Sequence, residues 1–410
     1  MKAEIISIGT ELLLGHIVNT NAAYLSRRLA ELGIDLYFQT TVGDNPQRLT
    51  QTIRKALVRS DVVILTGGLG PTIDDITSES VANLISKPLV FDASVWRDIQ
   101  KRFGSMGVKM PSGNKRQAMV PKGAICLRNN FGTAPALIVE YMDKVIICLP
   151  GPPREMEPLF EDQVASYLKK RFKSESIIVV RTIKIVGLPE SFVNNIVRDL
   201  LKMPPPTTVG IYAKLREVHL VIMAKARSPR QCRRAISPIE KEIVSRLRNN
   251  IFGYDGDTLE SIVGMMLLKK KLTISVAESC TGGLLSKRFT DVNGSSRYFM
   301  TGIVTYSNES KSSFLGVKRA DIVRFGAVSN EVASQMASGI KYFACTDIGI
   351  GITGVAGPAG GSLRKPIGLV YIAIKTSKKC IAKEFRFSGS REDVRHQASQ
   401  AALDMVRVNI

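Results

Sequence analysis

Histidine is scarce in this sequence, and cysteine is dispersed along it. The three histidines are His16, His219 and His396. They leave little room for histidine-rich metal sites, so any hydrolytic chemistry is expected to run without a Ser-His-Asp triad. The six cysteines form no C-x-x-C pair and show no zinc-finger spacing, which is typical of buried thiols in a reducing compartment.

Long apolar runs are also missing, and no signal peptide is expected at the start of this sequence. No apolar stretch approaches the ~20 residues that are needed to span a bilayer. The segment Met1–Ile6 is typical of a first strand rather than of a signal peptide, because Glu4 and Glu11 flank a very short apolar segment. We therefore expect a cytoplasmic protein with no membrane partner.

Acidic residues are outnumbered by basic ones. The formal net charge is +21, and residues 166–255 alone hold 18 basic and 7 acidic residues, or +11. Such a surplus suits nucleic acid or acidic ligands, while the simpler alternative is a general basic bias on solvated surfaces. The 410 residues, 44% of them hydrophobic, are too many for one ordinary core, so two or three globular domains are expected.

The first third alternates strands with amphipathic helices. Strands are predicted at Ala3–Ile8, Ile34–Val42 and Asp61–Leu65, and helices at about Asn19–Leu32 and Gln47–Ser60. Alternation of this kind predicts an α/β fold, here a doubly wound parallel sheet with helices on both faces.

A glycine-rich loop follows the third of these strands. Gly67, Gly68 and Gly70 would let the backbone approach a phosphate closely, and the neighbouring carboxylates of Asp74 and Asp75 suit a divalent metal that bridges diphosphate oxygens. A helix that begins nearby also attracts aspartate, since a carboxylate stabilises a helix N-terminus by ~0.3–1 kcal/mol. Helix capping readily explains the presence of one aspartate, but it poorly explains the combination of glycines and two aspartates in this loop.

Four motifs of this region resemble the amino-terminal domain of the CinA family. They lie within about residues 1–165 and are Ser7–Gly15, Gly67–Thr77, Gly132–Pro135 and Leu149–Pro153. The resemblance implies a molybdopterin-binding-like fold and a metal-dependent ADP-ribose pyrophosphatase that gives AMP and ribose 5-phosphate. It assigns a divalent metal (Mg, Mn or Co) to Asp74 and Asp75, and substrate binding to the loop glycines and Thr133. One departure is Ala136, where the family usually has glycine and where a methyl group could crowd the ligand.

Residues 166–255 form a basic connector. Strands are expected at Ile177–Val186, Thr208–Tyr212 and Val218–Ala226, with a helix at Ser237–Arg248. CinA proteins are similar in carrying a KH-like α+β segment here, but the G-x-x-G loop that clamps nucleotides in KH domains is missing. A packing and dimerisation spacer is the alternative to a nucleic-acid-binding module.

The last third begins with a strand that ends in a cluster of small residues. Thr273–Glu278 is rich in β-branched and apolar residues, and Ser279–Gly283 leads from it into a helical pattern. A strand that turns sharply into a helix displays the side chains of the turn and aims backbone N–H groups at the same space, which suits a nucleophile. A glycine-eased turn with no chemistry is the other interpretation. Cys280 rivals Ser279 as the nucleophile, but its thiol would need a lowered pKa.

This region, about residues 257–410, resembles the carboxy-terminal CinA domain, which also occurs alone as a nicotinamide-mononucleotide (NMN) amidohydrolase. The matching motifs are Ala277–Gly283, Thr305–Asn308 with Lys311, Gly326–Ser329, Thr353–Pro358 and Lys365–Gly368. The resemblance implies that Ser279 attacks the carboxamide carbon, with Lys311 as base and Tyr306 beside them, and it implies no cofactor. A lysine serves as base only when it is neutral, so burial has to lower its pKa from ~10.4.

Further positions are expected to line the substrate pocket. They are Thr281, Gly282, Gly283, Asn308, Thr353, Gly354, Arg391 and Arg395. Backbone N–H groups at the start of the helix after Ser279 are expected to hold the oxyanion, and the two arginines suit a phosphate. The family usually has aspartate at the positions of Ala359 and Ser390, and the loss of two carboxylates could weaken ligand positioning or leave a basic pocket shifted toward another anionic amide.

Together these features predict a homodimeric, two-site protein of pyridine-nucleotide salvage that acts on NMN and ADP-ribose. The rival hypothesis is a non-enzymatic nucleotide- or pterin-binding adaptor that works with nucleic acid in competence or DNA-damage responses. Its support is the charge of the connector, so nucleic acid is an open but less favoured partner.

Overall fold

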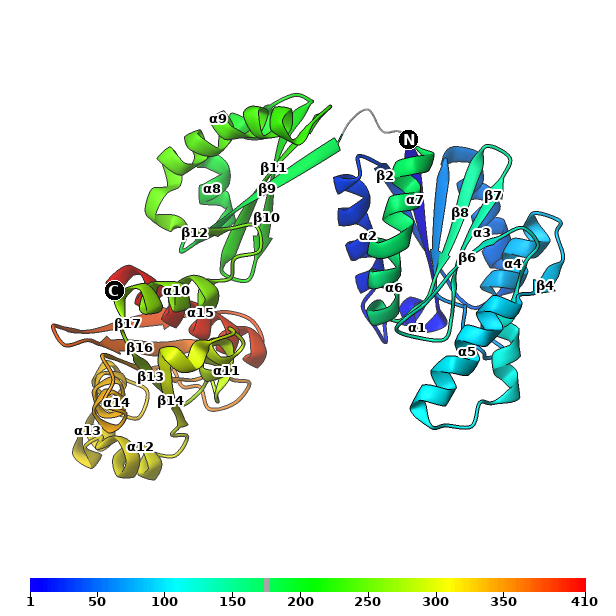
Figure 1. Ribbon diagram of the computed structural model, residues 1–410. Coiled ribbons are helices and arrows are strands. Elements are labelled where there is room, and N and C mark those ends of the chain that lie inside the picture. Colours follow the sequence, from blue (N-terminus) through cyan, green and yellow to red (C-terminus); the bar gives the residue numbers. More distant parts are fainter. Residues whose placement is uncertain (173–176) are drawn as a thin grey trace. The chain divides into compact units, whose positions relative to one another are not determined.

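The computed structural model describes residues 1–172 and 177–410 (Figure 1). The chain divides into two compact units, one of Met1–Val180 with Ala224–Ala235 and the other of Arg181–Met223 with Ile236–Ile410. Each unit is built from helices packed on β-sheet. Among the described residues, no helix is both long and apolar enough to cross a bilayer.

The first unit contains a six-stranded sheet in the order β2-β1-β3-β8-β7-β6. Its four parallel strands are β2 (Asp35–Val42), β1 (Lys2–Ile8), β3 (Val62–Thr66) and β8 (Lys144–Leu149). At the far edge, β7 (Ala136–Tyr141) pairs antiparallel with β8, and β6 (Ile125–Leu127) pairs antiparallel with β7. Only Met142 and Asp143 separate β7 from β8, and so short a connection returns the chain alongside itself. The α/β class is confirmed, but the sheet is mixed rather than wholly parallel.

Helices cover both faces of this sheet, as a doubly wound fold requires (Figure 1). One face carries α2 (Thr20–Glu31), α6 (Pro153–Leu159) and α7 (Ala165–Arg171), and the other carries α3 (Pro46–Arg59) and α4 (Thr77–Leu84). The remaining elements are α1 (Thr10–Leu13), β4 (Leu89–Phe91), α5 (Ala93–Met106) and β5 (Met119–Pro121). The carboxyl ends of β1, β3 and β8 therefore meet at one edge of the sheet, where such folds bind ligands.

Ala136 is the first residue of β7 and is fully buried. Its side chain belongs to a hydrophobic cluster that includes Leu25 of α2 and Leu159 of α6. Because the methyl group lies in this core, the expected crowding of a ligand by Ala136 is wrong.

The connector forms a four-stranded sheet in the order β10-β11-β9-β12. Its elements are β9 (Ile177–Val186), α8 (Glu190–Ile196), β10 (Thr207–Lys214), β11 (Glu217–Ala226), α9 (Pro229–Leu247) and β12 (Ile251–Tyr254). Val186 and Phe252 are buried in the same hydrophobic cluster as the core of the last domain. Within the second unit, the connector and the last domain thus share one core.

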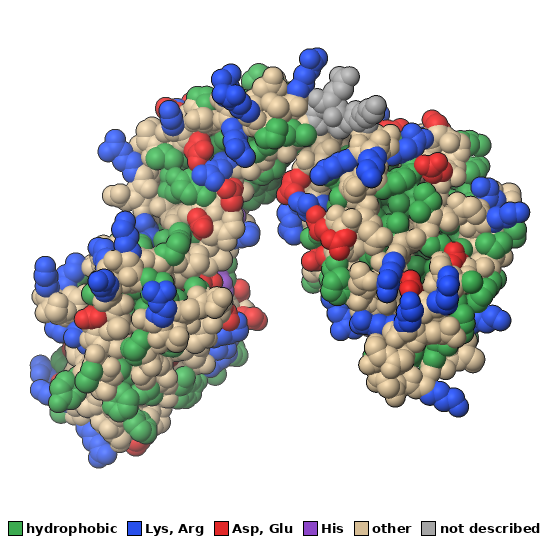
Figure 2. All heavy atoms as spheres, in the orientation of Figure 1, with side chains coloured by type: hydrophobic (Ala, Val, Ile, Leu, Met, Phe, Trp, Pro, Cys, Tyr) green, Lys and Arg blue, Asp and Glu red, His purple; other side chains and the backbone are tan. Residues whose placement is uncertain are grey.

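On the one face that Figure 2 shows, basic side chains are spread out rather than collected in one place. On the face shown in Figure 2, Lys and Arg are interspersed with acidic and apolar side chains. Within the connector, Arg181 pairs with Glu240, and Arg246 pairs with Asp199 and Glu242. This view favours a general basic bias over a single nucleic-acid-binding stripe.

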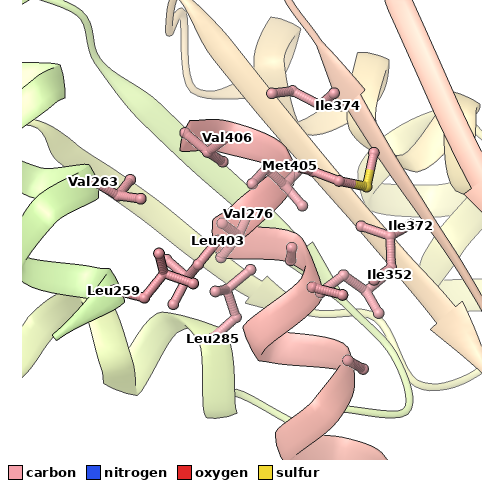
Figure 3. Packing of buried hydrophobic residues seen from close by; sticks show 14 of the residues in the cluster. Leu259, Val263, Val276, Leu285, Ile352, Ile372, Ile374, Leu403, Met405 and Val406 are labelled. Carbon is pink, nitrogen blue, oxygen red and sulfur yellow. The ribbon is translucent and has the colours of Figure 1, made fainter. Parts of the chain in front are cut away.

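The last domain is a five-stranded sheet in the order β14-β13-β15-β16-β17. Its strands are β13 (Ile274–Glu278), β14 (Phe299–Val304) and β15 (Ile348–Gly354), which are parallel, and β16 (Leu369–Lys375) and β17 (Cys380–Arg386), which are antiparallel. One face carries α10 (Leu259–Lys270), α11 (Leu284–Thr290) and α15 (Arg391–Asn409), and the other carries α12 (Asn308–Leu315), α13 (Arg319–Phe325) and α14 (Asn330–Phe343). Between the sheet and the first of these two sets of helices, Leu285 and Leu403 pack in one hydrophobic cluster with Ile352 of β15 (Figure 3).

Candidate active sites

The turn between β13 and α11 is fixed by a buried carboxylate. Glu278, which is fully buried, accepts hydrogen bonds from the amides of Gly283 and Leu285, both at 3.1 Å, and from Ser286 N at 2.8 Å and Ser286 Oγ at 2.6 Å. Four donors on one side chain hold the first turn of α11 against the end of β13. No role was predicted for Glu278, although a carboxylate directly before the turn is a visible signal in the sequence.

Ser279 and Lys311 meet inside this framework. Lys311 Nζ lies 3.0 Å from Ser279 Oγ. Both side chains are buried, with Ser279 8% and Lys311 1% exposed. Lys311 projects from α12, whose start is capped by the side chain of Ser307. Two residues that are 32 positions apart in sequence thus lie within hydrogen-bond distance, as the expected nucleophile and base would have to.

The surroundings of Lys311 favour its neutral form. Burial lowers the pKa of its amine below the ordinary value. Nζ is also within reach of the carbonyl oxygens of Thr305, at 2.8 Å, and Tyr306, at 3.1 Å. A neutral amine has two N–H donors, so these two carbonyls can hold both and leave the lone pair directed at Ser279 Oγ.

Of the amides expected to hold an oxyanion, at Ser279–Gly283, several already have an acceptor. Along the start of α11, Gly282 N donates to Ser279 O, while Gly283 N and Leu285 N are held by Glu278. In the part of the chain that the structure describes, the amides of Cys280 and Thr281 have no acceptor. The amides of Cys280 and Thr281, which directly follow Ser279, are therefore the candidates for oxyanion donors.

Two buried hydroxyl groups near the pair have no partner within the described residues. They are Thr281 Oγ1 and Thr305 Oγ1, and both side chains are fully buried. Buried polar groups are normally hydrogen-bonded, and exceptions cluster where a ligand or water completes the site. The placement of Thr281 therefore fits its predicted contact with substrate, and Thr305, for which no individual role was predicted, joins it.

Cys280 is a poor rival for Ser279. Burial raises the pKa of its thiol to about 12, in spite of the nearby Lys311 and Arg391. A thiol with this pKa is protonated at neutral pH, and only the thiolate is a strong nucleophile.

Two arginines of α15 reach the two glycine-containing loops of the site. Arg395 donates from Nε and Nη2 to Thr281 O, at 3.0 and 2.8 Å. Arg391 donates to Gly357 O at 2.7 Å and to the hydroxyl of Tyr306 at 3.1 Å. Tyr306 itself is 63% exposed, so it lies at the mouth of the site rather than in the core. The guanidinium groups are anchored on backbone oxygens and retain further donors for an anion.

For other predicted substrate residues, the described part of the chain shows no hydrogen bond with Ser279 or Lys311. Thr353 donates its hydroxyl to Ala327 O at 2.8 Å, and Gly354 packs where a Cβ atom would lie 2.6 Å from Val370 Cγ2. Asn308 is exposed at the start of α12. Gly282 and Gly283, in contrast, belong to the turn itself, where both adopt positive φ. Direct substrate contacts by Thr353, Gly354 and Asn308 stay predictions.

The amino-terminal glycine loop lies where β1, β3 and β8 end. A Cβ atom on Gly67 would be 2.3 Å from Ile8 O, and one on Gly68 would be 2.4 Å from Thr77 Oγ1. The hydroxyl of Thr77 donates to Gly67 O at 2.7 Å and so ties the loop to the start of α4. Close backbone packing explains why the loop uses glycine, and it leaves the surface of the loop open on one side.

This loop borders a cavity of about 470 Å³ with an acidic wall. The lining includes Gly67, Gly68, Gly70, Thr133 and the carboxylates of Glu11, Asp44, Asp74, Asp75 and Glu155. Not all of these carboxylates are free: Asp75 Oδ2 accepts from Thr72 N and Oγ1, at 2.8 and 2.7 Å, and Asp44 Oδ2 accepts from Thr10 N and Oγ1, at 2.9 and 2.7 Å. Across residues 1–172 and 177–410 no three acidic, cysteine or histidine side chains converge as a preformed metal site.

The donor set nevertheless fits a divalent ion that arrives with substrate. Asp74 is exposed on the wall of the cavity, and Asp75 keeps Oδ1 available beside it. Mg²⁺ is usually held by one or two carboxylates together with water and substrate phosphates, rather than by a complete protein cage. The two neighbouring aspartates, Asp74 and Asp75, therefore match the type and the number of protein ligands that such an ion needs.

Family models match nearly the whole chain. The "Probable molybdopterin binding domain" matches residues 4–170, the "Damage-inducible protein CinA KH domain" matches residues 180–253, and the "CinA C-terminal domain" matches residues 256–410. Their succession agrees with the three folded regions described above.

Relatives extend over the full length. A competence-damage inducible protein of Caldicellulosiruptor saccharolyticus is 49% identical over 410 residues, which cover 100% of this chain and 99% of that protein. A "CinA-like protein" of Kosmotoga olearia is 47% identical, with 99% and 98% covered. Among solved structures, a CinA protein of unknown function from Thermoplasma acidophilum is 35% identical, with a TM-score of 0.38, over 42% of this chain and 98% of that one. The chain belongs to the CinA family.

Proposed function

We propose that the carboxy-terminal domain is an amidohydrolase that converts NMN to nicotinate mononucleotide and ammonia. The observation that carries this proposal is the buried contact of 3.0 Å between Lys311 Nζ and Ser279 Oγ. An amine with a lowered pKa beside a serine hydroxyl is the arrangement that activates serine without histidine. The unpartnered hydroxyl of Thr281 and the anchored guanidinium of Arg391 add groups suited to a polar, anionic substrate.

The reaction would proceed in two steps on the same pair. Lys311 Nζ takes the proton of Ser279 Oγ as the oxygen bonds to the carboxamide carbon, and the amides of Cys280 and Thr281 donate to the oxyanion. The protonated amine then gives its proton to the departing nitrogen, so that ammonia leaves and an ester of Ser279 remains. Lys311 next takes a proton from water as the water oxygen bonds to the ester carbon, and it gives this proton to Ser279 Oγ as the bond from Oγ to carbon breaks, which releases nicotinate mononucleotide and restores both residues.

The phosphate of NMN would bind at the start of α15. Arg391 and Arg395 lie one helical turn apart, and both guanidinium groups are oriented by carbonyl oxygens of the loops beside Ser279. This arrangement keeps the phosphate away from Lys311 and leaves the nicotinamide end for Ser279. It explains why Tyr306, which contacts Arg391, would be a substrate-facing residue.

We further propose that the amino-terminal cavity cleaves ADP-ribose at its diphosphate. Asp74 and Asp75 Oδ1 would hold a divalent ion, and Gly68, Gly70 and Thr133 would surround the diphosphate. When bound, the ion supplies positive charge to the diphosphate oxygens and so favours attack on phosphorus. Thr72 keeps Asp75 in place, since two of its donors bind the other carboxylate oxygen.

Ammonia release decides the principal proposal. Purified full-length protein is incubated with NMN, and ammonia and nicotinate mononucleotide are quantified for the wild type and for Ser279→Ala. We expect turnover by the wild type and loss of turnover in the variant. A wild type that releases no ammonia, or a variant that is as active as the wild type, would refute it.

A further inference from the structure

A buried series of polar contacts joins the connector to helix α11. Glu217, on β11, accepts a hydrogen bond from Gln400 Nε2 at 2.6 Å, and Gln400 Oε1 accepts one from Arg288 Nη2 at 2.6 Å. Gln400 lies on α15 and is fully buried, and Arg288 lies on α11 and is 9% exposed. These contacts lead from a strand of the connector to the helix that starts at the Ser279 turn.

The orientation of the Gln400 amide depends on Glu217. A carboxylate only accepts hydrogen bonds and a guanidinium only donates them, whereas an amide has one side of each kind. Because Glu217 holds the NH2 group, the carbonyl oxygen of Gln400 faces Arg288. Without Glu217, the NH2 group of Gln400 loses its acceptor in a buried place, and Gln400 is held against Arg288 by one hydrogen bond instead of being fixed from both sides.

Glu217 is well suited to this role because it stays ionised. Burial acts to raise the pKa of its carboxyl, but hydrogen bonds from His219 and Gln400 outweigh burial and lower the pKa below the ordinary value. The contact with His219 Nε2 measures 2.9 Å and uses the second carboxylate oxygen. Both carboxylate oxygens of Glu217 are therefore hydrogen-bonded, one to His219 of the connector and one to Gln400 of the last domain.

Arg288 connects Gln400 to helix α11 and so to the turn that contains Ser279. Its guanidinium also donates to Glu260 of α10 at 2.7 Å and to Ser399 of α15 at 3.0 Å, so it fixes one end of α11 between two other helices. Glu278 fixes the opposite end of α11 through Gly283, Leu285 and Ser286. The helix has seven residues, and a displacement at Arg288 therefore reaches the turn that contains Ser279.

We propose that Glu217, a residue of the connector, is a positioning residue for the amidohydrolase site. It acts through Gln400 and Arg288 on α11 and on the Ser279 turn. The connector is then a working part of the site rather than a spacer. This inference rests on the proposed amidohydrolase function, but its structural half can be measured independently of that function.

The test compares Glu217→Ala with the conservative Glu217→Gln in the full-length protein. For Glu217→Ala we expect a kcat for NMN that is about tenfold lower, since small misplacements of reacting groups cost this much or more, with KM nearly unchanged. Deuterium exchange should be faster at the amides of Gly283, Leu285 and Ser286. Glu217→Gln keeps an oxygen for Gln400 and should retain both properties. Glu242→Ala, on α9 of the connector, is the matched control and should behave like the wild type.

A double-mutant cycle separates positioning from general damage. Gln400→Met keeps the volume of the side chain and removes both hydrogen bonds, so it should reproduce the loss in kcat. Combining it with Glu217→Ala should add no further loss, because both changes break the same series of contacts. Additive losses, or a Glu217→Ala variant with wild-type kcat and exchange, would overturn the inference.

Failure of the proposed function has a different signature. If wild-type protein releases no ammonia from NMN, the amidohydrolase is refuted, and exchange at the α11 amides still reports on the contact series. Faster exchange in Glu217→Ala would then support the structural half, and unchanged exchange would overturn it as well.

Discussion

Ser390 and Asp393 cap helix α15 reciprocally. Ser390 N and Oγ donate to Asp393 Oδ2, at 2.8 and 2.7 Å, and Asp393 N donates to Ser390 Oγ at 3.2 Å. Serine is as good an N-cap as aspartate, which the family resemblance leads one to expect at this position. The departure at Ser390 therefore preserves the local structure that orients Arg391 and Arg395. Nothing in the structure explains the other departure, Ala359, which is exposed.

Replacing this cap should change stability in a specific way. Ser390→Ala should lower the free energy of unfolding by ~1 kcal/mol, the typical loss for an N-cap. It should also raise KM for NMN, because the start of α15, which carries Arg391 and Arg395, is then less firmly fixed. Ser390→Asp should match the wild type in both. Urea unfolding and NMN turnover measure the two effects. Equal stability of Ser390→Ala and the wild type would show that the cap contributes nothing.

The rate of NMN deamidation should rise with pH. Burial lowers the pKa of Lys311, and only the neutral amine accepts the Ser279 proton, so kcat should increase as pH passes upward through this lowered pKa and then level off. Lys311→Met should reduce kcat by about 10²–10⁴-fold, the usual contribution of a general base. A kcat profile that falls over the same range would contradict the role of Lys311.

Stability should report the same titration. The pKa of the lysine in the unfolded chain is ~10.4, and in the folded chain it is lower, so between the two values the unfolded chain binds more protons. The free energy of unfolding of the wild type, relative to Lys311→Met, should therefore rise with pH through that window and stay constant below it. Chemical unfolding of both proteins over the alkaline range provides the comparison. A relative stability that falls with rising pH would contradict burial as the cause of the lowered pKa.

Cys280 should be dispensable. Its thiol has a pKa of about 12 because of burial, so it is protonated and unreactive near pH 7. Cys280→Ala should keep NMN turnover within about threefold of the wild type, since it removes one buried sulfur and leaves the backbone amide in place. Loss of turnover in Cys280→Ala, with Ser279→Ala still active, would reverse the assignment of the nucleophile.

Part of this molecule could be predicted from local sequence patterns. Alternating apolar segments gave the strands β1 and β3 and the helices α2 and α3 with their correct order, because buried strands and amphipathic helices have distinct periodicities. The antiparallel edge of the first sheet was not predicted, since it depends on the short Met142–Asp143 connection rather than on strand composition.

Residues of the carboxy-terminal site could be assigned a role from the sequence only through family motifs. Ser279 and Lys311 come from family motifs, and their contact depends on the pairing of β13 with β14, which sets the distance between the turn and α12. Glu278 and Thr305 lie inside these motifs, but their roles and that of Arg288 were not predicted, because they lie in hydrogen bonds to backbone or to distant helices. No periodicity or spacing encodes such contacts.

The two aspartates of the amino-terminal loop should respond differently to substitution. Asp74→Asn should lower ADP-ribose cleavage by about 10²-fold or more, as loss of a metal ligand does, without changing stability, because Asp74 is exposed and its side chain has no partner within the described residues. Asp75→Asn should also lose activity, yet it can still accept from Thr72 and keep the turn. Turnover at varied Mg²⁺ and thermal unfolding distinguish these effects. Full activity of Asp75→Asn would assign that residue to the turn alone.

The shared core predicts where the chain can be cut. A fragment of residues 177–410 keeps Val186 and Phe252 in the core of the last domain, whereas a fragment of residues 257–410 uncovers the surface that they bury. Each such side chain contributes ~1.5–3 kcal/mol on burial, so the shorter fragment should be less stable by about 3 kcal/mol or more. It should also lose the Glu217 contact to Gln400 and turn over NMN more slowly.

Urea unfolding of the two fragments measures this difference, and Phe252→Ala in the longer fragment serves as its control. Removing a buried phenylalanine costs ~3–5 kcal/mol, so this variant should approach the stability of the shorter fragment while its Glu217 contact stays in place. Its kcat should then remain above that of the shorter fragment. Equal stability of the two fragments would show that the connector and the last domain fold as independent cores.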